Sequence, residues 1–403
     1  HPLKDKINRE SFLHILKVAE EEQFPLATAD LFVINDAYRP TPTAGILRWL
    51  IEDNKINDLA KVLIATGCHQ PPTEEQLKVI LGDLYPQLHE RVLIHNARDM
   101  VGMVKLGKEH TIENVWINKY FYEAQRPVVI GSVEPHYFAG FTGGRKSIFP
   151  GLCDYDTTAR NHRLAVSFQA RPLRLEGNPV EEDLQSLMLM LGDKPVFSIQ
   201  VVGAYNKGIQ TAFMGDINTS FHQAAASARS VFVVKCEEKC DLLLAEVCPP
   251  LDSNLYQLQK ALENCQTAVA DGGTILLFSP CHEGIGPESF YKLADRWNPD
   301  LPLSDEFSNT LGIHKISRVK AIANRINVLL YSGLSPGIPD KVFFRSIREP
   351  QKIIDDLQNS SVACLPLACR TSRDEQGRTE KKENLRIALV RDAGHTVLVS
   401  PDD

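Results

Sequence analysis

The chain has 403 residues, more than one ordinary hydrophobic core accommodates, so two domains are expected. Its composition, 43% hydrophobic and 24% charged, is typical of a globular protein, and a net charge of −7 argues against a general nucleic-acid binder. No apolar run reaches the length of a membrane span. The polar start of the chain and nine scattered cysteines without a CxxC pair predict a cytoplasmic protein with reduced thiols, which contacts neither nucleic acid nor membrane.

The first part of the chain alternates short apolar runs with amphipathic stretches. Strands are expected at residues 31–34, 61–65, 91–94 and 128–133, and helices at residues 43–52 and 74–81. A capping box that runs from Thr73 to Gln76 marks the start of the second helix. This alternation predicts a parallel or mostly parallel sheet.

A second set of strands and helices begins near residue 240. Its strands are expected at residues 241–247, 273–278, 326–331, 362–367 and 386–390, and its helices at residues 254–264 and 287–297. Because a charged turn follows an apolar strand near residues 234–239, we expect domains at 1–237 and 238–403. The fold class is therefore α/β, with two α/β domains and mostly parallel sheets. The charged residues 370–384 are expected to form a solvated loop or helix face.

Polar side chains follow three of the strands expected in the first domain. Asp36 and Arg39 come after the first strand. His69 follows the second strand, and His136 follows the fourth. Ligands of open α/β sheets bind beyond the carboxyl ends of the strands. We therefore expect these side chains, together with Lys146, to lie on one rim and to share one site.

A glycine-rich segment at residues 134–147 ends near Lys146 and is the most informative stretch of the chain. Its spacing is similar to that of a phosphate-binding P-loop, but Arg145 stands where the second glycine belongs and Pro150 follows in place of a helix. An NTPase is therefore not expected. No convincing GxGxxG motif follows a strand, so a nicotinamide dehydrogenase lacks its fingerprint. A lysine in such a loop binds phosphate as a point charge or forms a covalent bond as an amine.

Two sets of side chains allow alternative interpretations from the residues alone. His69 and His136 either flank a substrate as acid and base or bind a metal with His162 as a third ligand, which predicts a zinc-dependent hydrolase. In the second domain, Gln257 and Lys260 share one face of the helix expected at 254–264. That face is either simply exposed or closes over an anion in a cleft between the domains.

The motifs, taken in order, resemble those of the nickel-pincer lactate racemase family of 2-hydroxy acid racemases and epimerases. They are D-x-x-R-P-T-P from Asp36, T-G-x-H from Thr66, E-P-H-x-x-A-G-F-x-G-G-x-K-S-I-x-P-G from Glu134, and the pair Asn161-His162. The resemblance covers nearly the whole chain. It implies an N-terminal cofactor-binding domain and a C-terminal Rossmann-like domain that closes over an interdomain active-site cleft.

The resemblance also implies a cofactor, a pyridinium-3-thioamide-5-thiocarboxylic acid mononucleotide that holds nickel through sulfur, carbon and sulfur. Lys146 looks like its covalent tether, and His162 looks like the nickel ligand contributed by the protein. Asp36 and Arg39 look like contacts to cofactor or substrate. Because other enzymes build this cofactor, they are implied as partners of the chain.

For the reaction, the resemblance implies inversion of C2 of a small-molecule 2-hydroxy acid by reversible, proton-coupled hydride transfer through a 2-keto acid. His69 and His136 look like the acid/base pair. The substrate side resembles that of the family at Arg39, Tyr256, Gln257 and Lys260. One departure concerns a tryptophan that the lactate enzyme places near its substrate, because none of the three tryptophans aligns with it. The segment 311–315, which contains His314, lies in roughly that region, and the acid that is inverted is left open.

Overall fold

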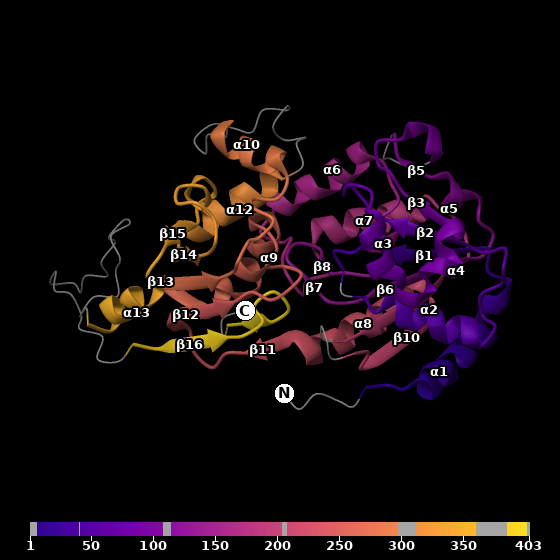
Figure 1. The fold of residues 1–403 in the computed structure, drawn as a ribbon, viewed down its shortest axis with the longest axis horizontal. Coiled ribbons are helices and arrows are strands. Elements are labelled where there is room, and N and C mark those ends of the chain that lie inside the picture. The colour runs from indigo at the N-terminus through magenta and orange to yellow at the C-terminus, as the bar shows by residue number, and fades with distance from the viewer. Residues whose placement is uncertain are drawn as a thin grey trace. The chain divides into compact units, whose positions relative to one another are not determined.

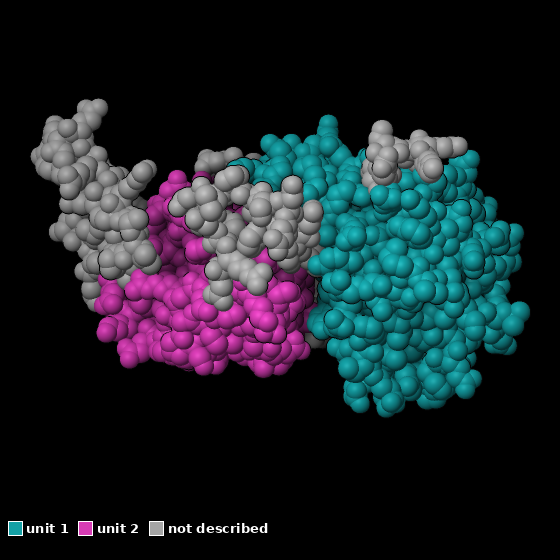
Figure 2. Space-filling model, turned by 90° about the horizontal axis from the view of Figure 1, so that it is seen from above, with its two compact units in different colours: residues 1–232 teal, residues 233–403 magenta. Residues whose placement is uncertain are grey.

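The computed structural model describes residues 6–39, 41–107, 114–203, 208–296, 312–359 and 385–400. The chain divides into two compact units, residues 1–232 and 233–403, which Figure 2 shows in different colours. The boundary expected after residue 237 falls between the first two strands of the second unit. Among the residues described, no helix is both long and apolar enough to cross a bilayer.

The first unit is built on a six-stranded sheet with the order β10-β9-β6-β1-β2-β3 (Figure 1). Its strands are β1 (Leu31–Asn35), β2 (Lys61–Ala65), β3 (Val92–Ile94), β6 (Pro127–Ser132), β9 (Phe197–Val202) and β10 (Thr211–Asp216). Only the β9–β10 pair is antiparallel, and the other four pairs are parallel. Two small antiparallel hairpins accompany the sheet, β4 (Met103–Lys105) with β5 (Trp116–Asn118), and β7 (Pro135–His136) with β8 (Gly140–Phe141).

Helices accompany the sheet of the first unit, and several of them bury an apolar face. They are α1 (Arg9–Glu22), α2 (Thr43–Glu52), α3 (Glu74–Leu81), α4 (Tyr85–Leu88), α5 (Lys119–Glu123), α6 (Tyr155–Arg163), α7 (Pro179–Leu189) and α8 (Ile217–Phe232). The short 3-10 turns are η1 (Leu26–Thr28), η2 (Gly82–Leu84), η3 (His89–Arg91), η4 (Met100–Gly102), η5 (Gly144–Ser147) and η6 (Leu164–Val166). The capping box expected at Thr73 is present, with both reciprocal hydrogen bonds formed to Gln76. Strand β6 is buried along its whole length. Its sequence is continuously apolar because parallel strands are covered on both faces.

The second unit contains a five-stranded, fully parallel sheet with the order β15-β14-β13-β12-β16. Its strands are β12 (Cys240–Glu246), β13 (Val269–Phe278), β14 (Asn327–Tyr331), β15 (Arg345–Ile347) and β16 (Ile387–Val390), and a separate parallel pair joins β11 (Val233–Lys235) to β17 (Val397–Val399). The helices are α9 (Leu255–Cys265), α10 (Glu288–Arg296), α12 (Ile313–Ala323) and α13 (Pro350–Asn359), with 3-10 turns η7 (Gln266–Ala268) and η8 (Pro339–Val342).

The structure confirms the expected α/β class with mostly parallel sheets in two units. The strand expected at 362–367 and the charged stretch at 370–384 lie outside the described residues. The helix expected at 287–297 corresponds to α10, and residue 297 also lies outside the described residues. His314 lies in the first turn of α12 and is buried.

Candidate functional site

The expected rim is formed by three neighbouring strands of the first unit. β6, β1 and β2 are adjacent and parallel, so the segments that follow them leave the same edge of the sheet. Hydrogen bonds join two of these segments, because Asn35 Nδ2 donates to Thr41 Oγ1 at 2.8 Å and Thr41 Oγ1 lies 2.9 Å from Ser132 Oγ. The loop after β1 is therefore held against the end of β6.

Asp36 and His69 form a hydrogen bond across the ends of β1 and β2. His69 Nδ1 lies 2.5 Å from Asp36 Oδ2. The carboxyl is only 7% exposed, whereas the imidazole is 38% exposed at its side chain. Burial acts to raise the pKa of Asp36, but the charge and hydrogen bond of His69, the charge of Arg39 and the Tyr38 N–H together lower that pKa. The carboxylate therefore stays ionised and fixes the ring through Nδ1, which leaves Nε2 for chemistry.

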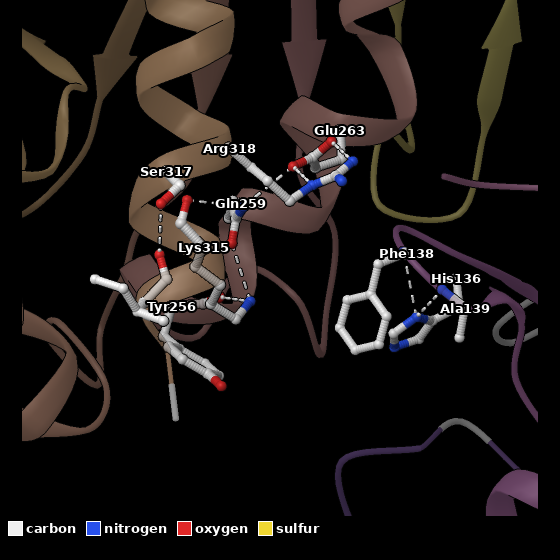
Figure 3. A network of polar contacts seen from close by, with 10 residues as sticks. His136, Phe138, Ala139, Tyr256, Gln259, Glu263, Lys315, Ser317 and Arg318 are labelled. Atoms are coloured by element: carbon white, nitrogen blue, oxygen red, sulfur yellow. Dashed lines mark hydrogen bonds and ion pairs between the residues drawn. The ribbon is translucent and has the colours of Figure 1, made fainter. Parts of the chain in front are cut away.

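His136 lies in the tight hairpin of β7 and β8, directly beyond β6, and is buried. The backbone N–H groups of Phe138 and Ala139 point at its Nδ1, at 3.5 and 3.3 Å (Figure 3). Thr142 closes the hairpin, because its Oγ1 donates to Ser132 O and its backbone N–H donates to Glu134 O. In contrast to His69, whose Nδ1 faces a carboxylate, the Nδ1 of His136 faces N–H donors and accepts hydrogen bonds from them.

Three of the expected site residues lie around the ring of Phe138. The ring centroids of Phe138 and His136 are 4.5 Å apart, and those of Phe138 and His162 are 5.0 Å apart, both edge-on. Lys146 Nζ lies 5.2 Å from the same centroid, at cation–π distance. The structure thus gathers an amine from η5, an imidazole from α6 and an imidazole from the β7–β8 hairpin around one aromatic ring. We call these four residues the Phe138 cluster.

The glycine-rich loop does not continue into a P-loop helix. After Gly143, which has a φ of 77°, the chain forms only the short turn η5, and the next helix, α6, begins at Tyr155. The glycines serve close packing of the loop: a Cβ on Gly144 would lie 2.6 Å from the Phe221 side chain. This geometry agrees with the exclusion of an NTPase.

The residues Tyr256, Gln257 and Lys260 lie in the first turns of α9 in the second unit. Asn254 caps this helix by accepting a hydrogen bond from the Gln257 N–H at 3.0 Å. Gln257 is 6% exposed, and its side-chain Oε1 is buried and has no hydrogen-bond partner among the described residues. Gln257 is therefore not part of a simply exposed helix face.

Lys315 of α12 is a buried lysine whose contacts could not be predicted from the sequence. Its Nζ donates to Tyr256 O at 3.0 Å and to Gln259 Oε1 at 3.1 Å, and lies 4.0 Å from the centroid of the Tyr256 ring (Figure 3). Arg318, one turn further on, binds Glu263 of α9 with two nitrogens at 2.6 and 2.7 Å. These contacts join α12 to the first turns of α9 and fix Tyr256.

Burial lowers the pKa of Lys315 well below its ordinary value. The positive charges of Lys260 and Arg318 act in the same direction, and only Glu263 opposes them. A positive charge on Lys315 is thus costly in the folded chain, although two oxygens and an aromatic ring face its amine.

The three histidines proposed as zinc ligands are held in unlike surroundings. His69 is bound to Asp36, His136 to backbone N–H groups, and His162 packs edge-on against Phe138. Across the described ranges, no group of three or more His, Cys, Asp or Glu side chains has the geometry to hold a metal ion. The described side chains therefore give no support to the alternative of a three-histidine zinc centre for a hydrolase.

Several residues around the site gave no usable sequence signal. Phe138 stood unnoticed inside the glycine-rich stretch, and Glu181 and Gln200 are brought to η5 only by the fold, where they bind Arg145 and the Gly144 N–H. Arg145 attracted attention only as the residue that breaks the P-loop pattern.

A rim of polar side chains beyond a parallel α/β sheet is the arrangement of a small-molecule site in an open α/β fold. Residues 22–172 match the family described as lactate racemase N-terminal domain, and residues 237–314 match the lactate racemase C-terminal domain. The chain therefore belongs to the lactate racemase family.

Two curated relatives are lactate racemases. That of Thermoanaerobacterium thermosaccharolyticum is 31% identical over 269 residues, which cover 65% of this chain and 62% of the relative. That of Lactiplantibacillus plantarum is 31% identical over 280 residues, which cover 67% of this chain and 64% of the relative. The matched segment spans less than two thirds of either relative.

Two solved structures share the fold. The lactate racemase apoprotein from T. thermosaccharolyticum has a TM-score of 0.79 at 24% identity, covering 98% of this chain and 94% of that chain. A protein from Thermotoga maritima has a TM-score of 0.70 at 15% identity, covering 99% and 100% of the two chains. At these identities the likeness is one of fold.

Proposed function

We propose that this protein is a racemase or epimerase that inverts C2 of a 2-hydroxy acid, lactate or a larger relative, with a nickel-pincer nucleotide attached to Lys146. The observation that carries the proposal is the Phe138 cluster. An amine suited to a covalent tether, an imidazole suited to nickel and an imidazole suited to proton transfer surround one ring. Membership of the lactate racemase family supports the same reaction.

The side chains of the Phe138 cluster fit a nickel-pincer nucleotide better than they fit a metal ion held by protein side chains alone. A pincer cofactor brings its own sulfur and carbon donors, so the protein needs to add one imidazole, and His162 is the candidate. Lys146, whose Nζ lies 5.2 Å from the centroid of the Phe138 ring, is the candidate tether. When bound, the group supplies a carrier that takes a hydride from C2 and returns it.

His69 and His136 transfer the hydroxyl proton of the substrate. One ring accepts that proton as the 2-hydroxy acid becomes a planar 2-keto acid, and the other returns a proton when C2 is rebuilt with the opposite hand. Asp36 stabilises the positive charge that develops when His69 gains a proton at Nε2. The backbone N–H groups at His136 Nδ1 hold the second ring at a fixed angle.

The substrate carboxylate needs a cation that holds it while the central carbon turns. Arg39, which follows β1, and Lys260, on α9, are the candidates for this role. We propose that Tyr256 and Gln257 contact the substrate and help to exclude water from the keto acid. In this account the partners are the 2-hydroxy acid and the enzymes that build the cofactor, and the chain works in the cytoplasm.

Metal analysis and intact mass of protein made in a host that synthesises the cofactor test this proposal. We expect nickel and a mass adduct that maps to Lys146 and is absent from Lys146→Ala. Stoichiometric zinc with an unmodified Lys146 would overturn the proposal. A panel of enantiopure lactate, malate, aryl-lactates and aldonic acids then identifies the substrate.

A further inference from the structure

We infer that Arg145 is a positioning residue, whose buried ion pair with Glu181 holds the backbone of η5 so that the neighbouring Lys146 faces the cofactor. The inference rests on the proposed function only for the identity of what Lys146 holds. The positioning itself is argued from contacts within the first unit.

Arg145 and Lys146 are adjacent but reach different parts of the unit. Arg145 Nη2 is bound to Glu181 Oε1 of α7, and its guanidinium carbon lies 5.0 Å from the Phe221 ring of α8. Its Nη1 is also 3.5 Å from Asn218 Oδ1 at the start of α8. Lys146, by contrast, is at the Phe138 ring. A rotation of η5 that displaced Lys146 would therefore pull Arg145 away from two helices.

Gly144 and Gly143, which precede Arg145, also hold the backbone of η5 in place. The Gly144 N–H donates to Gln200 Oε1 of β9 at 2.8 Å. A Cβ on Gly143 would lie 2.6 Å from the same Gln200 oxygen, so no larger residue fits there without a shift. Arg145 adds contacts to α7 and α8. Three elements that are distant in sequence, β9, α7 and α8, therefore fix η5.

Stability alone does not explain the ion pair. The side chains of Arg145 and Glu181 are 4% and 1% exposed, so both charges have lost nearly all of their hydration. Burial lowers the pKa of Arg145 to about 10. Replacing such a pair by apolar residues of similar size is often neutral or stabilising, whereas removing one partner is costly. Because such a pair is weak evidence for a role in stability, we explain its place beside the proposed tether by the position that it imposes on η5.

The test compares wild type with the double variant Arg145→Met/Glu181→Leu, both made with the cofactor. We expect a thermal midpoint at or above that of wild type, amide hydrogen exchange in residues 143–147 faster by about tenfold or more, and a several-fold lower fraction of chains modified at Lys146. Lys55→Met/Glu20→Gln, which removes another ion pair of the first unit, is the matched control and should leave exchange at 143–147 and Lys146 loading unchanged. If the double variant does not fold, Arg145→Lys, which keeps the charge but loses the planar fork, should show the same changes to a smaller extent.

Wild-type exchange rates and wild-type loading in the folded double variant would overturn the inference. Failure of the proposed function looks different: wild-type Lys146 is then unmodified, while exchange at residues 143–147 still increases in the double variant. The two failures are thus distinguishable in one set of samples.

Discussion

Replacing Lys315 by Met should change how the stability of the second unit depends on pH. The ammonium of Lys315 is fully buried between α9 and α12, and burial together with the charges of Lys260 and Arg318 lowers its pKa. In the unfolded chain the same amine has its ordinary pKa of 10.5. Between the two values the unfolded chain binds one proton more than the folded chain at this site, so the stability contribution rises with pH.

The size of this effect follows from a single proton. Inside the window between the lowered pKa and the ordinary one, the free energy of unfolding of wild type gains about 1.4 kcal/mol per pH unit from Lys315. Lys315→Met lacks this term, so its stability relative to wild type falls by the same amount for each unit. The hydrogen bonds to Tyr256 O and Gln259 Oε1 are lost as well, each worth about 1 kcal/mol, and this loss shifts the whole curve without changing its slope.

Urea unfolding of the full chain, followed by far-UV circular dichroism at several pH values from 7 to 10, measures this difference. Lys292→Met, which removes an exposed lysine of the same unit, corrects for the loss of a surface charge. Stability curves of wild type and Lys315→Met that run parallel over this range would refute the reasoning, because Lys315 would then keep its proton on folding.

Three further predictions concern the first unit. Asp36→Asn should lower kcat of the loaded enzyme about 10- to 100-fold, since a charge-assisted bond to His69 is worth about 1.5–3 kcal/mol, and a chiral assay that finds full activity would contradict this role. Because the folded-state pKa of Asp36 is lowered, its contribution to stability is complete above the ordinary value of 3.8 and is lost as pH falls through the folded value; acid unfolding of Asp36→Asn should lack that component. Gly144→Ala should destabilise the unit by about 2–4 kcal/mol, as its φ is 51° and the new methyl would lie 2.6 Å from Phe221, and a melting curve that matches wild type would exclude this crowding.

Local pattern predicted much of the fold. The helix expected at 43–52 is α2, with the same bounds, and the strand expected at 61–65 is β2. In α2 the apolar residues recur at the helical period, whereas β2 is a short continuous apolar run, so each signal is contained within ten residues or fewer. The rim was predictable for a related reason: in a parallel sheet, the polar residues that end each strand meet at one edge.

The contacts that shape the site were not predictable in this way. Arg145 meets Glu181, and Phe138 meets His162, only because α6 and α7 fold back against the β7–β8 hairpin and η5. Such pairings lie far apart along the chain and leave no periodic pattern. The burial of Lys315 was missed for a similar reason, since a lysine is ordinarily expected at the surface and only the packing of α12 on α9 encloses it.

The central claim is that the loaded enzyme inverts a 2-hydroxy acid through paired histidines, and a chiral assay tests it most directly. Enantiopure L- and D-lactate, with larger 2-hydroxy acids in parallel, are incubated with cofactor-loaded wild type, His69→Ala and His136→Ala. We expect wild type to drive both enantiomers of at least one acid to an equal mixture, and each histidine variant to be slower by at least about 100-fold. Loaded wild type that leaves every acid enantiopure, or histidine variants that racemise at the wild-type rate, would contradict the claim.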